Sequence, residues 1–149
     1  MSLAVLLATA LLGQDAEPCQ LPDLVGVWEL AALETENAQT AEVIRRAPHE
    51  WIRFRPDGAT VWLASNQSRP SLDVIHADLD AADKIDGGDW RAGFPQPGRL
   101  ILSRDGRPME AFDCVVASGD EPDAQVGDLI LTSAPGLVRT RRVQRRVGP

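Results

Sequence analysis

The chain has 149 residues, of which 44% are hydrophobic and 25% are charged, and its formal net charge is −7. These values are typical of one soluble globular domain with its own core, and they exclude a disordered chain. Because the negative charge repels nucleic-acid phosphates, we expect no nucleic-acid partner.

The first segment favours export. An apolar run extends from Leu3 to Leu12 and contains the small-residue triplet Ala8-Thr9-Ala10. A membrane-spanning helix needs about 20 apolar residues, so the run is too short to cross a bilayer and is typical of a secretory signal peptide. We therefore expect a signal peptide over residues 1–16, a single domain over residues 17–149, and a periplasmic or secreted bacterial location without a membrane span. The alternative is an N-terminal helix buried in the fold.

The chain contains two cysteines, Cys19 and Cys114. In an oxidising compartment, two distant cysteines predict a disulfide, which would close a long loop and stabilise the fold by roughly 4–5 kcal/mol on the chain-entropy model. The alternative is two separate thiols. The chain has no Cys-x-x-Cys motif and no Cys/His spacing typical of zinc, so we expect no metal and no cofactor.

The first predicted strand covers residues 24–33, which are rich in Val, Trp and Leu. Residues 36–47 predict a short helix that ends before Pro48, because the residue before a proline avoids the helical region.

Two further strands, 50–55 and 59–64, flank the turn Pro56-Asp57-Gly58. If this is a three-residue turn with a glycine bulge, Ile52 lies opposite Trp62 and Phe54 lies opposite Thr60 on one face. Arg53 and Arg55 then lie on the other face, which we expect to be solvated. Trp51 shares that face and is expected to be exposed, where it would mark a surface for a partner.

Residues 69–89 are the least regular stretch. Residues 71–76 predict either a strand or an anchored loop, and the aspartates between Asp78 and Asp89 predict a solvated acidic loop rather than a calcium site, because the EF-hand spacing is absent. On a strand, His76, Asp78 and Asp80 would share one face, but a metal site needs a more complete set of ligands, so we interpret His76 as a rim residue.

The remaining strands are predicted at residues 89–92, 99–103, 109–117, 128–133 and 137–143. The segments 104–107 and 134–136 are predicted as tight turns. Counting all segments, about eight short strands alternate with turns, which is the pattern of a β-barrel or a β-sandwich. We predict an all-β fold, an antiparallel up-and-down meander barrel with one short helix between the first two strands.

The order of these motifs resembles the small bacterial lipocalin-like domains. The matching segments are Gly26-Val27-Trp28, Phe54-Arg55-Pro56-Asp57-Gly58, Gly87-Gly88-Asp89-Trp90, Arg99-Leu100-Ile101-Leu102 and Asp128-Leu129-Ile130-Leu131. The resemblance implies that an arginine of the last strand covers Trp28 beside Gly26 and closes the barrel, and Arg141 or Arg142 is the expected residue. Arg145 and Arg146 are interpreted as a frayed tail.

The aromatic residues point to a function. Phe54, Trp62, Trp90 and Phe112 are predicted to line an interior cavity for a small apolar or amphipathic ligand. Alternatively, they fill a small barrel completely, and the protein then acts through its surface and loops as a protein-interaction or protease-inhibitor-type module. No Gly-x-Ser-x-Gly elbow occurs and there are two histidines, so we expect no catalytic residues and no enzyme activity. We expect a monomer.

Overall fold

The computed structural model describes residues 16–149, so the predicted signal peptide lies almost wholly outside the described residues. The elements, in chain order, are β1 (Glu17–Pro18), α1 (Leu21–Leu24), β2 (Gly26–Thr35), α2 (Ala38–Arg46), β3 (His49–Phe54), β4 (Thr60–Ser65), α3 (Leu72–Asp86), β5 (Trp90–Gln96), β6 (Arg99–Arg104), β7 (Arg107–Val116), β8 (Leu129–Ser133) and β9 (Thr140–Gly148). Among residues 16–149, no helix has both the length and the apolar character needed to cross a bilayer.

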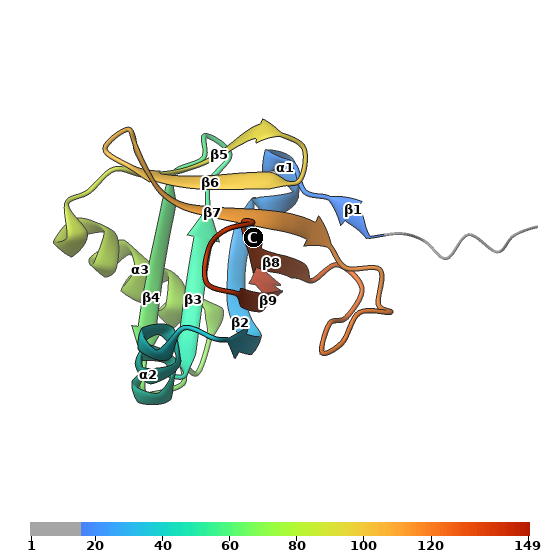
Figure 1. The fold of residues 1–149 in the computed structure, drawn as a ribbon. Helices are drawn as coiled ribbons and strands as arrows, with labels where there is room; N and C mark the ends of the chain where they lie inside the picture. Colours follow the sequence, from blue (N-terminus) through green and yellow to red (C-terminus); the bar gives the residue numbers. More distant parts are fainter. Residues whose placement is uncertain (1–15) are drawn as a thin grey trace, which may run out of the picture.

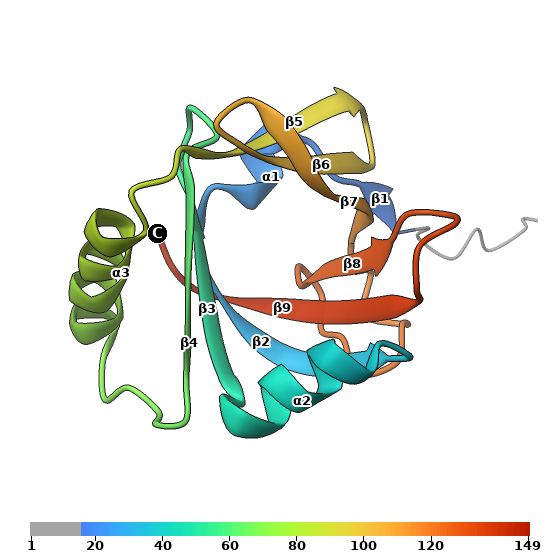
Figure 2. The same cartoon turned by 60° about the vertical axis from the view of Figure 1, so that its left-hand side comes forward.

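The strands form one antiparallel sheet in the order β4-β3-β2-β9-β8-β7-β6-β5, with β1 added beside β7. Figures 1 and 2 show that this sheet curls strongly into a barrel-like wall. The last strand pairs with the first long strand, from Val27 opposite Gly148 to Thr35 opposite Thr140. Apart from this pair and the two-residue β1 beside β7, all neighbouring strands are consecutive in the chain, so the predicted all-β antiparallel meander is confirmed.

The barrel wall is open between β4 and β5. Ala59, the residue before β4, forms an isolated bridge with Arg91 of β5, and the Ala92 backbone N–H donates to the Gly58 carbonyl over 2.8 Å. Gly58 has φ +87°, and a Cβ there would lie 2.6 Å from the Ala92 carbonyl oxygen. A glycine is therefore required both by the turn and by the close approach of β5.

The predicted β3–β4 hairpin is confirmed in its register. The Arg55 N–H donates to the Ala59 carbonyl over 2.9 Å, Ile52 pairs with Trp62, and Phe54 pairs with Thr60. The turn between β6 and β7 has Asp105 and Gly106 at φ 50° and 78°, the left-handed pair that a two-residue hairpin turn needs.

The short helix between the first two long strands is also found. α2 begins after Asn37, whose side chain accepts hydrogen bonds from the backbone N–H groups of Gln39 and Thr40. It ends before Pro48, as the restriction on residues preceding proline predicts.

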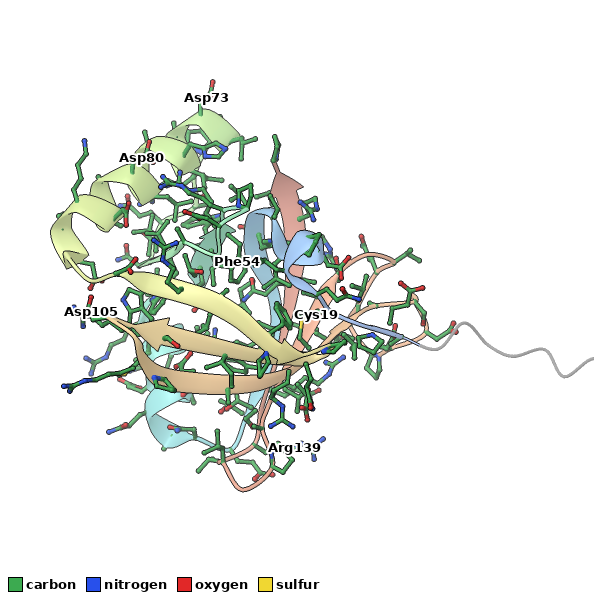
Figure 3. All side chains as sticks on the ribbon, turned by 90° about the horizontal axis from the view of Figure 1, so that it is seen from above. Cys19, Phe54, Asp73, Asp80, Asp105 and Arg139 are labelled. Atoms are coloured by element: carbon green, nitrogen blue, oxygen red, sulfur yellow. A yellow bond between two sulfur atoms is a disulfide. The ribbon has the colours of Figure 1, made fainter. Side chains whose placement is uncertain are left out.

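The prediction of a strand or loop at residues 71–76, followed by an acidic loop, is wrong. This segment is helix α3, which begins after the Ser71 cap and ends at left-handed Gly87. Four apolar residues recur at helical spacing and pack on the sheet: Leu72, Ile75, Leu79 and Ala82. The aspartates occupy the remaining positions of the helix, and Figure 3 shows two of them, Asp73 and Asp80, on α3 at one side of the barrel.

α3 covers the outer face of β3 and β4 (Figure 2), and this corrects two expectations. Trp51, expected to be exposed, is 1% exposed and packs in a cluster with Val27 and Leu79. Arg53, expected to be solvated, is 7% exposed. Both side chains point away from the barrel interior, as the alternation predicts, but the helix removes that face from water.

Candidate ligand site at the barrel mouth

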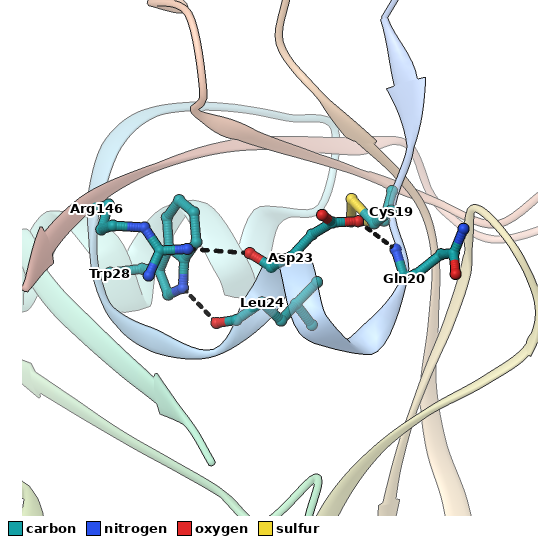
Figure 4. Close-up of a disulfide and its surroundings, with 7 residues drawn as sticks. Cys19, Gln20, Asp23, Leu24, Trp28 and Arg146 are labelled. Atoms are coloured by element: carbon teal, nitrogen blue, oxygen red, sulfur yellow. Dashed lines mark hydrogen bonds between the residues drawn. A yellow bond between two sulfur atoms is a disulfide. The ribbon is translucent and has the colours of Figure 1, made fainter. Parts of the chain in front are cut away.

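One end of the barrel, here called the base, is closed around Trp28. The Trp28 indole N–H donates to the Leu24 carbonyl over 2.7 Å, and the guanidinium of Arg146 lies 4.3 Å from the ring centroid (Figure 4). Arg146 also donates to the carbonyls of Asp23 and Val25. Gly26 lies beside this contact, where a Cβ would approach the Gly148 carbonyl to 2.8 Å.

The arginine over Trp28 is therefore Arg146, which corrects the assignment of Arg141 or Arg142 and of a frayed tail. The physical reason is the register of the last strand. β9 continues to Gly148, and an irregularity in the β2–β9 ladder between Leu30 and Ala32 places Arg146 opposite Trp28. Arg141 instead donates to the Pro122 carbonyl, and Arg142 lies inside the barrel at its other end.

The predicted disulfide between Cys19 and Cys114 is present, and it fixes the N-terminal segment to the base. The two Cα atoms are 5.4 Å apart, and both side chains are fully buried. The Cys19 N–H also donates to the Cys114 carbonyl over 3.0 Å. Together with fully buried Leu24, Leu100 and Leu129, the disulfide forms the hydrophobic core of the base.

The opposite end of the barrel, the mouth, is hollow. A cavity of about 100 Å³ lies inside the wall. It is lined by Glu50, Ile52, Trp62, Leu102, Glu110, Phe112, Leu131, Arg142 and Gln144. A second cavity of about 310 Å³ adjoins it at the end of the barrel and shares Glu110, Phe112 and Arg142 with the first. The two cavities are therefore neighbours at the mouth, separated or joined by these three shared side chains.

A polar cluster stands in the inner cavity. Arg142 Nη1 donates to both carboxylate oxygens of Glu50, at 2.7 and 2.9 Å, and the Gln144 side-chain amide donates to the same carboxylate at 3.3 Å. The Arg142 and Glu50 side chains are 20% and 14% exposed, so water screens their ion pair only in part. Gln144 is 1% exposed, and its Oε1 has no hydrogen-bond partner among the described residues.

Glu110 stands where the two cavities meet. Crowding by protein atoms in the concave wall raises the pKa of its carboxyl; Arg142 opposes this shift and Glu50 adds to it. The Glu110 residue keeps an exposed surface at the mouth, so its desolvation is partial.

Three large apolar residues surround the outer cavity and remain exposed to water. Met109, Leu137 and Val138 are 56%, 57% and 55% exposed, and all three line that cavity. An exposed apolar group beside a hollow is typical of a binding surface.

The four aromatic residues predicted to line one cavity are separated. Trp62 and Phe112 line the inner cavity, whereas Phe54 is buried in the core at the base. Trp90 contacts Trp62 edge to face across the open seam, with ring centroids 4.5 Å apart. Trp62 and Trp90 also line a separate cavity of about 330 Å³ beneath the last turns of α3.

The predicted rim residue His76 and its acidic neighbours hold α3 on the sheet. Arg53 donates to Asp80 over 2.8 Å, and its other amino group lies 3.3 Å from His76 Nδ1. The hydrogen bond from Arg53 keeps the pKa of the Asp80 carboxyl below its usual value. Within residues 16–149, no group of three or more His, Cys, Asp or Glu side chains is arranged to hold a metal ion.

Sequence reasoning missed Glu50 and Gln144, and it gave Arg142 a different role. The alternation of side chains along β9 could have indicated them, because it places Arg142 and Gln144 on the same face as Arg146. The arrangement offers hydrogen-bond acceptors, one ion pair and aromatic walls for binding. No family model, no curated protein and no solved structure matches the chain, so these residues themselves carry the functional argument.

Proposed function

We propose that this chain is a non-enzymatic, lipocalin-like binding protein that holds a small amphipathic molecule at the barrel mouth. The observation that carries the proposal is the pair of adjoining cavities at the mouth, the inner one of about 100 Å³ and the outer one of about 310 Å³. Ligand pockets in proteins commonly have volumes of about 300–1,000 Å³.

The distribution of polar and apolar groups supports an amphipathic ligand. The outer cavity presents Met109, Leu137 and Val138, which suit an apolar chain or ring. The inner cavity presents Glu50, Arg142 and Gln144, which suit a polar group. We therefore place the apolar part of the ligand outward and its polar group inward.

An exported location belongs to the same proposal. The predicted signal peptide and the disulfide between Cys19 and Cys114 are both typical of an oxidising compartment. A periplasmic or secreted protein of this kind would carry or sequester its ligand as a monomer.

A second candidate function is a protein-interaction module, and the buried hydrophobic core at the base favours it. In that case Ile85 and Val126, which are 85% and 79% exposed on other parts of the surface, would contact the partner. The two functions differ in which apolar side chains matter.

Titration of the full chain with the neutral fluorescent probe N-phenyl-1-naphthylamine tests the proposal. Val138→Asp places a charge in the outer cavity, and we expect it to weaken probe binding by about tenfold. The matched control Val126→Asp should leave the affinity unchanged. If Ile85→Asp, beside the α3 cavity, weakens binding while Val138→Asp does not, the mouth is not the site. Native mass spectrometry of protein from its own host then measures whether a small molecule is retained, and a bare polypeptide mass would count against the ligand.

A further inference from the structure

We infer that the mouth selects a cationic N–H donor, a primary ammonium group on an amphipathic amine. This inference rests on the proposed function, because it names the chemical class of the ligand for the same cavity. Three features of that cavity support it: an unused hydrogen-bond acceptor, a carboxylate without a paired cation, and aromatic lining residues.

The hydrogen-bond inventory leaves an acceptor unused. The Glu50 carboxylate only accepts hydrogen bonds, so the Gln144 group that approaches it must be the amide NH₂, which fixes Gln144 Oε1 as the free atom. Gln144 is 1% exposed and lines the inner cavity. A buried carbonyl oxygen without a donor is unfavourable. Oε1 has almost no surface open to water, so a ligand N–H would satisfy it once the Gln144 amide turns toward the cavity.

The charges in the cavity leave one carboxylate uncompensated. Glu50 and Glu110 each carry a carboxyl group, and Arg142 is the one cation among the residues that line the inner cavity. Arg142 is committed to Glu50 through two short contacts. No ion pair joins Glu110 to another residue of the described chain. A cationic ligand would supply the missing positive charge, whereas a carboxylate, phosphate or sulfate would meet two acids.

The walls of the cavity also suit a cation. Trp62 and Phe112 both line the inner cavity, and the faces of aromatic rings attract ammonium groups. A primary ammonium has three N–H donors, which matches Gln144 Oε1 and the carboxylates of Glu110 and Glu50. The apolar part of the amine would then extend past Phe112 into the outer cavity.

Three amphiphiles with the same chain and different head groups test the inference: octylammonium, 1-octanol and octyl sulfate. Each is titrated below its aggregation concentration against the full chain, with displacement of N-phenyl-1-naphthylamine as the readout. We expect octylammonium to bind about tenfold more tightly than 1-octanol and octyl sulfate to bind most weakly. The preference for the amine should decrease as ionic strength increases.

Variants separate this site from general attraction to a negative protein. Glu110→Gln should weaken octylammonium binding about tenfold and leave 1-octanol binding unchanged. The control Glu34→Gln, at an exposed position of β2, removes the same net charge from a residue that lines neither cavity, and it should change neither affinity. Gln144→Met, which removes the free acceptor, should also weaken only the amine; if it does not fold, Glu110→Gln and the ionic-strength series decide.

The outcomes distinguish the two proposals. If octyl sulfate or 1-octanol binds as tightly as octylammonium, the mouth binds amphiphiles without selecting amines and this inference is overturned. Equal losses in Glu110→Gln and Glu34→Gln would overturn it too, because net charge alone would explain the binding. If neither the probe nor any amphiphile binds, the proposed function itself is wrong.

Discussion

At the scale of single residues, the contact between Trp28 and Arg146 closes the base. The Trp28 ring is 1% exposed, and the guanidinium that covers it also donates to two backbone carbonyls of the segment before β2. The cation thus joins the last strand to the start of the first long strand. Its loss removes a cation–π contact and leaves those carbonyls to water.

We expect Arg146→Ala to lower the free energy of unfolding by about 1–2 kcal/mol. Urea unfolding followed by tryptophan fluorescence measures this value. Arg141→Ala is the control, because Arg141 makes a single hydrogen bond to the exposed Pro122 carbonyl and should have a smaller effect. Equal losses would mean that the position of Arg146 over Trp28 contributes nothing.

Glu121 organises the loop between β7 and β8. Its carboxylate accepts hydrogen bonds from the Ser118 N–H at 3.0 Å, the Ser118 hydroxyl at 2.9 Å and the Gly119 N–H at 3.0 Å. These bonds, led by that of the Ser118 backbone, lower the pKa of Glu121 from 4.5 to about 2. The folded protein therefore holds this carboxylate ionised under conditions that protonate the unfolded chain.

Because the folded pKa is the lower one, the stabilisation by Glu121 is present above the ordinary value of 4.5 and is lost as the pH falls toward about 2. We expect Glu121→Gln to be less stable than the wild type at pH 6 and closer to it at pH 2.5. Urea midpoints across this range test the prediction. A constant difference between the two proteins would show that the carboxylate's charge is not the cause.

The effect of Glu110 on the pH dependence of stability is opposite in sign to that of Glu121. Since crowding in the cavity wall raises its pKa, the folded protein binds this proton more tightly, and stability falls as the pH rises from the usual value through the raised one. We expect Glu110→Gln to be at least as stable as the wild type at neutral pH, as measured by thermal unfolding, while it loses affinity for amines. A clear loss of stability would mean that the Glu110 carboxylate is needed by the fold.

At the scale of elements, helix α3 buries the outer face of β3 and β4. Leu79 is fully buried between the helix and the sheet, whereas Ile85 on the same helix is 85% exposed. We expect Leu79→Ala to lower the free energy of unfolding by about 2–5 kcal/mol and Ile85→Ala to change it by less than about 0.5 kcal/mol. Chemical denaturation of both variants measures the contrast, and similar values would show that the helix is only loosely attached.

The elements also show which parts of the fold the local sequence was sufficient to predict. Pro56-Asp57-Gly58 and Asp105-Gly106 determine their turns through dihedral preferences of those residues. The register of the β3–β4 hairpin therefore followed from the sequence, and for β6 and β7 the position of the turn did. α3 was mispredicted because its aspartates obscured the helical spacing of its apolar residues. The burial of Trp51 and Arg53 then could not be predicted, because the helix that covers them had been assigned as loop.

At the scale of the whole molecule, the disulfide is the main covalent constraint, because it joins residues 95 positions apart. We expect the double variant Cys19→Ser/Cys114→Ser to lose about 2–5 kcal/mol of stability. Intact mass under non-reducing and reducing conditions should differ by two hydrogens in the wild type. Equal masses would show that the bond does not form in the protein as made.

The sequence by itself determined the alternation, the hairpin turns, the number of long strands and the pairing of the cysteines, because each depends on near neighbours or on simple chemistry. Only the tertiary structure decided that Arg146 covers Trp28, that α3 buries the outer face of β3, and that Gln144 is left with a free acceptor inside the mouth. These features depend on the register of strands more than a hundred residues apart and on what packs against each face. The free energy of the whole molecule, through its total burial and hydrogen bonding, determines which of these contacts form. A local sequence pattern does not contain that information.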